Sequence, residues 1–161
     1  MNLKILWAPW RASYVEKPGE TCIFCEKASE NKDEENLIIL RGQRSFIMLN
    51  RYPYNTGHLM IAPYRHIASI EDLSEEEAVE IFKLLRESIK AVKKAFKPDG
   101  FNIGVNIGKV AGAGVEGHIH IHVVPRWLGD TNFMPVTANT KVMPVSLKET
   151  YERIKRAMQS L

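Results

Sequence analysis

The five histidines of this 161-residue chain are the side chains best suited to chemistry. Three of them, His118, His120 and His122, alternate with apolar residues in one short run. Side chains of a β-strand alternate between its two faces, so a strand here would place the three imidazoles on one face. One such histidine is typical of a packed core, whereas three at every second position favour a reaction centre or a metal site.

Two kinds of chemistry fit three neighbouring imidazoles. A neutral imidazole can attack phosphorus and form a phosphoramidate that a second acceptor resolves, while its neighbours stabilise charge on the phosphoryl oxygens. Alternate histidines of one strand can also bind a catalytic zinc ion that activates water. The spacing alone leaves both mechanisms open.

A glycine-rich stretch leads directly into these histidines. Six of the ten glycines fall within residues 100–117, and residues 112–117 match the pattern G-x-G-x-x-G. That pattern runs into a β-patterned segment rather than opening a helix, which excludes a dinucleotide-binding fold. It is not a P-loop either, because Val110 follows Lys109 where Ser or Thr is required. Composition alone favours a flexible hairpin loop, but attachment to three histidines favours a phosphate cradle.

The two cysteines form a C-x-x-C pair, Cys22 and Cys25. Half of a zinc site, a redox pair and two incidental buried cysteines all fit this spacing. A thioredoxin-type pair follows a strand, whereas residues 16–21 have the composition of a loop. Zinc usually takes four ligands, so a zinc site would need two more from elsewhere in the chain.

The elements that must position these residues follow from apolar periodicity. A long helix is predicted over residues 74–97, where Ser74 and Glu77 form a capping box. A last helix should begin near Ser146. The apolar residues at helical spacing in the long helix are Val79, Phe82, Leu85, Ile89, Val92 and Phe96. Five strands are predicted at 37–40, 46–49, 58–62, 101–106 and 119–125. Together they predict an α+β domain with an antiparallel five-stranded sheet, a long helix and a C-terminal helix.

Composition and charge narrow the class of protein. The chain is 45% hydrophobic and 25% charged, as in globular proteins. We expect one domain, with an N-terminal segment 1–35, a core 36–127 and a C-terminal extension 128–161. No apolar run approaches the ~20 residues of a membrane span, and no export signal is apparent, so we expect a cytoplasmic protein with reduced or metal-bound cysteines. The net charge of +3 argues against duplex nucleic acid as a partner.

The histidine run, HIHIHVV at 118–124, resembles the signature of the histidine triad superfamily. The segment LNRYPYNTGHLMIAP at 49–63 is similar to the ribose-binding strand–loop–strand of that superfamily. The third histidine argues against the uridylyltransferase branch, which usually has glutamine there. The chain looks closest to the diadenosine tetraphosphate phosphorylase-like group, because of WAPWR at 7–11, AGAG at 111–114, VPRW at 124–127 and GDTNFM at 129–134.

This resemblance implies an α+β histidine-triad fold and assigns roles to the histidines. His120 would be the nucleophile that takes up AMP, His122 would contact the scissile phosphate and its leaving group, and His58 would lie near the same phosphate. Trp127, directly after the triad, is a candidate to stack on adenine or to pack in the core or at a dimer contact. The further substrate contacts that the resemblance implies are Asn50, Asn106, Gly112 and Gly114. The cations near the expected site in sequence are Arg11, Arg51, Lys109 and Arg126.

The resemblance also implies a structural zinc ion and a homodimer. Some members of the superfamily bind zinc at positions that correspond here to Cys22, Cys25, His66 and His118. Such a site would leave the other two triad histidines for chemistry. The dimer would join two sheets through the long helix and an adjacent strand.

One departure from the family pattern bears on the reaction. Hydrolase branches usually carry Gln, Ser or Thr three or four residues before the first triad histidine, where this chain has Gly114 and Val115. The smaller loop would admit inorganic phosphate as acceptor. We therefore expect phosphorolysis of a dinucleoside polyphosphate to ADP and ATP. A hydrolase of the same substrates, an adenosine phosphoramidase and a nucleotide-binding regulatory protein without turnover are the alternatives.

Overall fold

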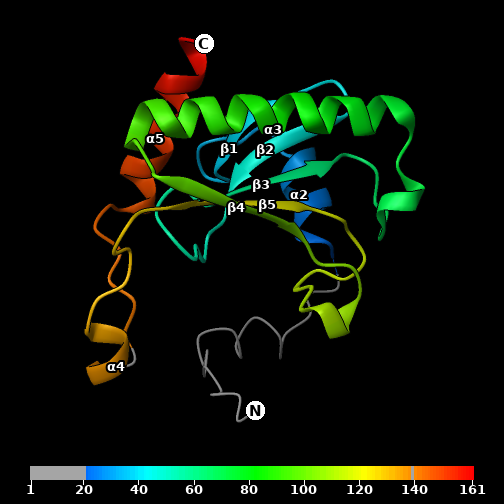
Figure 1. Cartoon of the computed structure of the whole chain (residues 1–161). Helices are drawn as coiled ribbons and strands as arrows, with labels where there is room; N and C mark the ends of the chain where they lie inside the picture. Colours follow the sequence, from blue (N-terminus) through cyan, green and yellow to red (C-terminus); the bar gives the residue numbers. More distant parts are fainter. Residues whose placement is uncertain (1–20, 139) are drawn as a thin grey trace.

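The structure, a computed structural model, describes residues 21–138 and 140–161. Its centre is a five-stranded antiparallel sheet in the order β1-β2-β3-β5-β4 (Figure 1). The strands are β1 (Ile38–Arg41), β2 (Ser45–Leu49), β3 (Leu59–Pro63), β4 (Gly100–Val105) and β5 (Ile121–Arg126). The predicted fold class and sheet are confirmed, with strand ends that differ by at most two residues.

Two helices cover one face of this sheet. The long helix α3 (Glu75–Phe96) crosses it, and α5 (Leu147–Gln159) packs against α3 and β1 (Figure 1). Alternation along β2 sends Ile47 and Leu49 into the core beneath these helices. The main buried partners from the two helices are Ile81, Leu84, Ala91, Val92, Tyr151 and Ile154.

The opposite face of the sheet holds a second, smaller core. Phe46 and Met48 of β2 and Met60 of β3 pack there against Phe24. Phe24 belongs to the short helix α2 (Ile23–Ser29), which no sequence pattern predicted. Because β2 and β3 are covered on both faces, all ten of their residues are buried.

The predicted helix start is confirmed, but part of the expected apolar stripe is exposed. Ser74 Oγ accepts the Glu77 N–H, and the Glu77 carboxylate accepts the Ser74 N–H. Val79 and Phe82 are nevertheless 54% and 66% exposed. Leu85, Ile89, Val92 and Phe96 do contact the core, but the most buried positions of α3 are Ile81, Leu84, Ala91 and Val92. Helical spacing therefore located the helix and only part of its buried face. Likewise Ser146 caps α5 as predicted.

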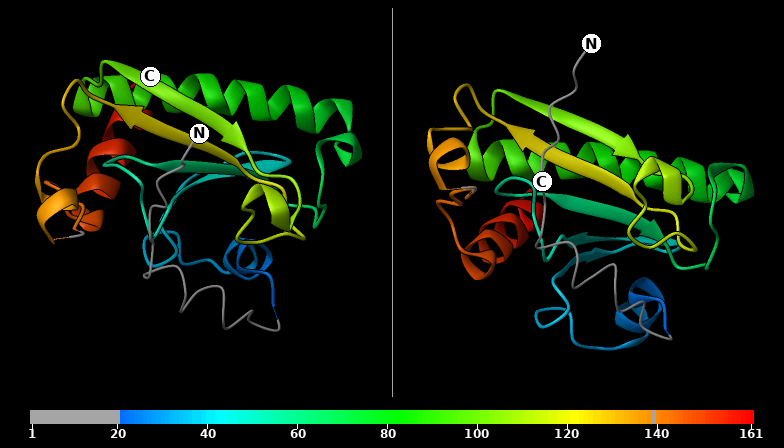
Figure 2. Two further views of the ribbon diagram at one scale, coloured as in Figure 1. Left: turned by 60° about the horizontal axis from the view of Figure 1, so that its bottom comes forward. Right: turned by 90° about the horizontal axis from the view of Figure 1, so that it is seen from below.

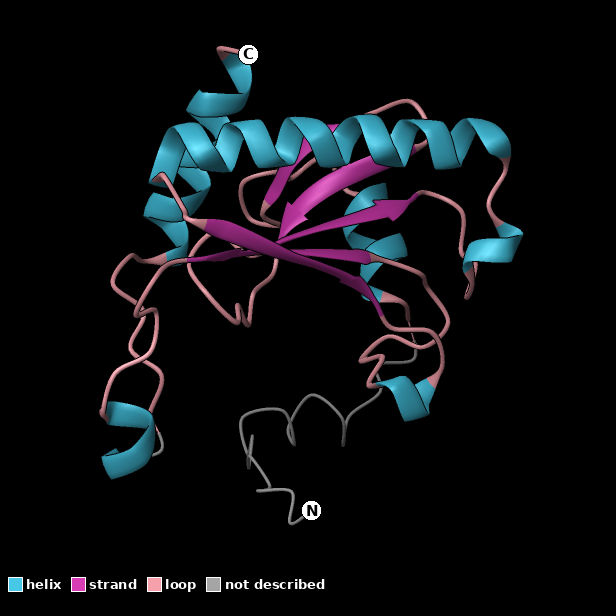
Figure 3. Cartoon of the chain, viewed as in Figure 1, coloured by secondary structure: helices cyan, strands magenta, loops and turns pink. Residues whose placement is uncertain are grey.

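Two long connections leave β5 at its opposite ends and extend on the side away from α3 (Figure 3). The first, residues 106–120, contains the glycine-rich stretch and the 3-10 turn η3 (Lys109–Ala111). The second, residues 127–146, contains the short helix α4 (Met134–Ala138), and Figure 2 shows both connections on the side of the sheet opposite α3. A further 3-10 turn, η2 (Ile70–Asp72), precedes α3. In the described part of the chain, no helix has both the length and the apolarity needed to cross a membrane.

Candidate functional site

A cleft of about 330 Å³ opens on the face of the sheet that α2 covers. Helix α2 forms one wall, the apolar side chains of β2 and β3 form its floor, and the loop after β2 and the glycine-rich loop form its rims. Two of the triad histidines stand at one side of it. The lining residues are Ile23, Phe24, Lys27, Met48, Asn50, Arg51, Tyr52, Tyr54, Met60, Gly112, Gly114, His120 and His122.

The histidine strand is shorter than predicted. Only His122 lies in β5, whereas His118 and His120 precede it. The reason is that the N–H of Ile119 donates to Ile67 O at 2.7 Å, in the loop after β3, so the strand ladder begins only at Ile121. The imidazoles of His120 and His122 are nevertheless close together, with ring centroids 4.8 Å apart.

The protonation of His120 is fixed by a backbone carbonyl. Its Nδ1 lies 2.9 Å from the carbonyl oxygen of His118. A carbonyl oxygen only accepts, so Nδ1 carries the proton and Nε2 keeps the lone pair. Burial lowers the pKa of His120, which favours this neutral form. A neutral imidazole with a lone pair on Nε2 is the form that acts as a nucleophile.

A second imidazole pair has its tautomers set in the same way. The N–H of Tyr54 donates to Nδ1 of His58 at 3.1 Å, so the proton of neutral His58 lies on Nε2. That Nε2 is 2.9 Å from Nδ1 of His122, which accepts. Neutral His122 then carries its own proton on Nε2. Complete burial, with the charges of His122 and His120, lowers the pKa of His58 to about 3.

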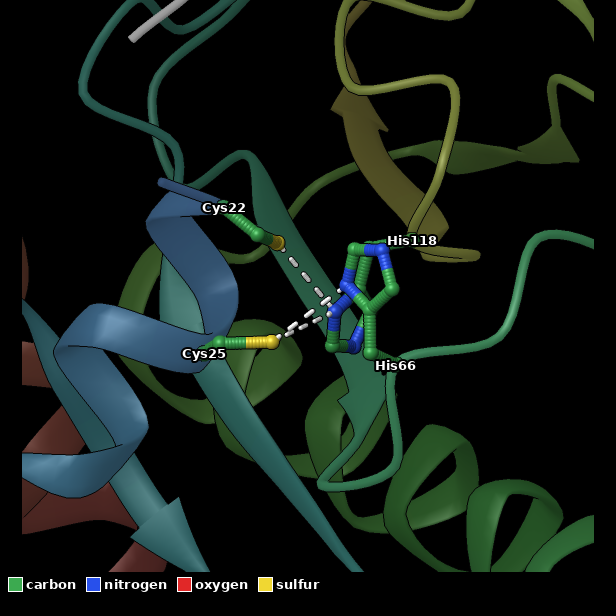
Figure 4. Close-up of side chains that lie close together, drawn as sticks. All are labelled: Cys22, Cys25, His66 and His118. Carbon is green, nitrogen blue, oxygen red and sulfur yellow. Dashed lines mark hydrogen bonds between the residues drawn. The ribbon is translucent and has the colours of Figure 1, made fainter. Parts of the chain in front are cut away.

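Four further side chains converge beside the cleft (Figure 4). Cys22 and Cys25 come from the start of α2, His66 from the loop after β3, and His118 from the segment before β5. Their ligand atoms all lie within 4.8 Å of one another. His118 Nδ1 is 3.3 Å and 3.5 Å from the two sulfur atoms, and His66 Nδ1 is 3.4 Å from Cys25 Sγ.

This donor set fits a tetrahedral metal ion. Zn–S bonds of about 2.3 Å and Zn–N bonds of about 2.0 Å separate S and N by about 3.5 Å in a tetrahedron. His118 donates from Nε2 to Pro63 O at 2.9 Å, which leaves Nδ1 free to bind and orients the ring. Gly117 leaves room for the His66 ring beside this cluster, since a Cβ at position 117 would lie 3.0 Å from His66 Nε2. The residues are therefore close enough, and suitably oriented, to hold a metal.

The expected substrate contacts fall into two groups. Asn50, Gly112 and Gly114 line the cleft, and Asn106 lies at its edge, with Nδ2 3.4 Å from Gly112 O. The N–H of Gly112 already donates to Lys109 O at 3.0 Å, so this expected phosphate donor is engaged within its own turn.

Trp127 lies outside the cleft. Its indole N–H donates to Phe96 O at 3.3 Å, and its ring faces a separate hollow beyond β5. Of the four cations named from the sequence, Arg51 lines the cleft, whereas Arg126 is bonded to Asp130 and Asn102. Trp7, Trp10 and Arg11 lie outside the described residues.

Several residues that line or support the cleft have no distinguishing pattern in the sequence. Phe24, Met48 and Met60 have the apolar character of ordinary core residues, and only the fold shows that they face a cavity. The Phe24 ring packs against both His118 and His120, at centroid distances of 5.1 Å and 4.7 Å. The backbone N–H of Tyr54 has no signature in the sequence at all.

Comparison with known proteins agrees with this geometry. A model of the HIT domain family matches residues 31–127. An AP-4-A phosphorylase of Mycobacterium tuberculosis is 38% identical over 158 residues, which cover 92% of this chain and 81% of the relative. A bis(5'-adenosyl)-triphosphatase of Dictyostelium discoideum is 33% identical over 89 residues, 55% of this chain and 59% of that protein.

The fold has a solved counterpart in a zinc-bound histidine triad family protein from Mycobacterium smegmatis. The two share a TM-score of 0.69 and 24% identity, over 87% of this chain and 94% of that one. The family model covers more than half of the chain and includes the histidine run. The chain therefore belongs to the HIT domain family and is an enzyme of the histidine triad superfamily.

Proposed function

We propose that this enzyme is a nucleotidyl transferase that cleaves dinucleoside polyphosphates, with diadenosine tetraphosphate as substrate and inorganic phosphate as the preferred acceptor. The observation that carries the proposal is the bond between His120 Nδ1 and the His118 carbonyl, because it leaves Nε2 as a nucleophile at the cleft. The name of the M. tuberculosis relative supports the same substrate class.

The reaction has two displacements at phosphorus. In the first, His120 Nε2 attacks the α-phosphorus, a P–N bond forms, and the P–O bond to the ATP leaving group breaks. In the second, an oxygen of inorganic phosphate attacks the same phosphorus, the P–N bond breaks, and ADP is released. The ring becomes positively charged during the first step, and the hydrogen bond from Nδ1–H to the His118 carbonyl stabilises that charge. His122 donates its Nε2 proton in a hydrogen bond to the leaving oxygen.

The cleft provides complementary surfaces for the rest of the nucleotide. Its apolar wall and floor, including Phe24 and Met48, suit an adenine ring. Asn50 and the neighbouring Arg51 stand at the same rim, where an amide can bind ribose hydroxyls and a guanidinium can face phosphate. Lys27 adds a second cation to the cleft lining.

We also propose that Cys22, Cys25, His66 and His118 hold a structural zinc ion. A complete four-ligand set leaves no open position for water, as in structural rather than catalytic zinc sites. When bound, the ion supplies a cross-link between α2, the loop after β3 and the triad segment. Its place beside the cleft lets these residues hold the α2 wall against the sheet.

A homodimer is the third part of the proposal. β4 pairs only with β5 among the described strands, so its other edge has no strand partner. Ile103 of β4 is 47% exposed, and Phe82 of α3 is 66% exposed. Apolar side chains beside an open strand edge are the surface that a second copy would cover.

Product analysis distinguishes phosphorolysis from the alternative of hydrolysis, which the name of the D. discoideum relative favours. The enzyme is incubated with diadenosine tetraphosphate, with and without phosphate. We expect ADP and ATP in equal amounts, at a rate that depends on phosphate. AMP and ATP at the same rate in both samples would establish hydrolysis instead.

The nucleophile is tested separately. His120→Ala should abolish turnover and should prevent the adenylylated protein from appearing in intact mass spectra. Loss of turnover should leave AMP binding within about threefold, because the apolar walls remain. Full activity in this variant would contradict the covalent route.

A further inference from the structure

Asp130 lies outside the segment that the family model matches, yet its carboxylate is a centre of hydrogen bonds. Its side chain is 9% exposed. Oδ2 accepts from Arg126 Nε at 2.5 Å and from Asn55 Nδ2 at 2.8 Å. The guanidinium of Arg126 holds the pKa of this carboxyl at about 2, so it is charged at neutral pH.

Asn55 links that carboxylate to the loop between β2 and β3. It is 6% exposed, and its Nδ2 also donates to Pro125 O at 3.0 Å. Both protons of the amide are therefore bound. The backbone carbonyl of Asn55 accepts the N–H of His58 at 3.1 Å, and its neighbour Tyr54 donates to His58 Nδ1. The Asn55 side chain is thus fixed in the middle of the turn that sets the tautomer of His58.

We propose that Asp130 is a positioning residue for the His58–His122 pair. By holding Asn55, it keeps the Tyr54 N–H on His58 Nδ1, which leaves the proton of His58 on Nε2 and makes His122 Nδ1 the acceptor. The proton of His122 is then directed from Nε2. Only the effect of this proton on a leaving group rests on the proposed function; the tautomers themselves do not.

The test compares two single substitutions, their combination and a control. Asp130→Asn removes the charge and leaves one oxygen for the donors of Asn55, Arg126 and the Trp127 backbone. Asn55→Asp sets two carboxylates against each other. The double variant restores one hydrogen bond with donor and acceptor exchanged. Lys141→Met is the control, because Lys141 contacts only the backbone oxygen of Asp130 in this network, at 2.7 Å.

The first readout is the ¹⁵N ring shifts of His58 and His122, which report the tautomer directly and do not depend on activity. We expect one tautomer in the wild type and in Lys141→Met, and averaged shifts in each single variant. The second readout is AMP transfer from diadenosine tetraphosphate. Each single variant should lose about tenfold in kcat with little change in KM, since displacing a proton donor acts on the reacting geometry. The double variant should recover part of both signals.

Wild-type ring shifts in a folded single variant would overturn the positioning role. Changed shifts with an unchanged kcat would refute the effect of the His122 proton on the leaving group. If the single variants do not fold, the double variant is compared with Asn55→Ala. Averaged shifts in the folded double variant, equal to those of folded Asn55→Ala, would also overturn the positioning role. Absence of nucleotidyl transfer in the wild type, with the expected ring shifts, would refute the proposed function and leave the positioning role intact.

Discussion

The chemistry proposed for this enzyme depends on which nitrogen of each imidazole carries the proton. The sequence singled out His120 and His122 by their spacing, and His58 by the resemblance to the histidine triad superfamily. It could not indicate their tautomers, since these are set by the backbone: the His118 carbonyl for one ring and the Tyr54 N–H for another. Backbone groups are present at every residue, so only the folded geometry shows which of them bind a side chain.

The buried His58 predicts a pH dependence of stability. Its pKa is about 3 in the folded chain, against about 6.5 when unfolded, so acid protonates the unfolded state first. Stability from this group is therefore complete above about pH 6.5 and falls as the pH decreases towards 3. Between pH 8 and pH 5 the loss from this one group should be about 2 kcal/mol.

Urea unfolding at these two pH values, with wild type and His58→Gln, measures that loss. The glutamine does not titrate, and its amide can still donate to His122. The difference between pH 8 and pH 5 should be smaller in the variant by about 2 kcal/mol. An identical pH dependence in both proteins would show that His58 takes up its proton in the folded state as well.

At the scale of elements, the sequence predicted the regular helices and strands but not the short helix α2. The long helix and its capping box follow from local spacing, and so do all five strands. The exposed Phe82 shows that spacing does not decide which side of a helix meets the sheet. Helix α2 has only seven residues, too few for a periodic signal, although it carries Cys25 and one wall of the cleft.

Zinc content tests the role of α2. Protein purified without chelator should contain about one zinc ion per chain. Cys22→Ser should lower that content well below one and reduce the free energy of unfolding, since an ion at about 100 times its dissociation constant stabilises by about 2.7 kcal/mol. Ser29→Ala, at the exposed end of the same helix, is the matched control and should keep both. A metal-free wild type would contradict the prediction.

At the scale of the whole molecule, the sheet ends at an edge that has no strand partner among residues 21–138 and 140–161. The family model stops at residue 127, and the remaining segment returns along α3 as α5 rather than covering β4. The order of the strands could not be read from the sequence, because local patterns do not specify which strands pair. It is this order that leaves β4 at the rim of the sheet beside an exposed part of α3.

Light scattering with size-exclusion chromatography tests whether a second copy covers this edge. We expect a wild-type mass of twice 18.4 kDa. Phe82→Glu and Ile103→Glu should shift the protein towards the monomer, since each places a charge on the proposed contact. Val110→Glu, at a fully exposed residue in the glycine-rich connection, should not. A monomeric wild type would refute the dimer.

One phenyl ring touches both the imidazole that can bind an ion and the imidazole that can bond to phosphorus. Any replacement of Phe24 therefore changes the surroundings of both His118 and His120. A change in the backbone between these two histidines does the same. A mutation at Phe24 cannot alter one of these imidazoles without affecting the other. The proposed ion binding and the proposed turnover are therefore coupled through this one ring.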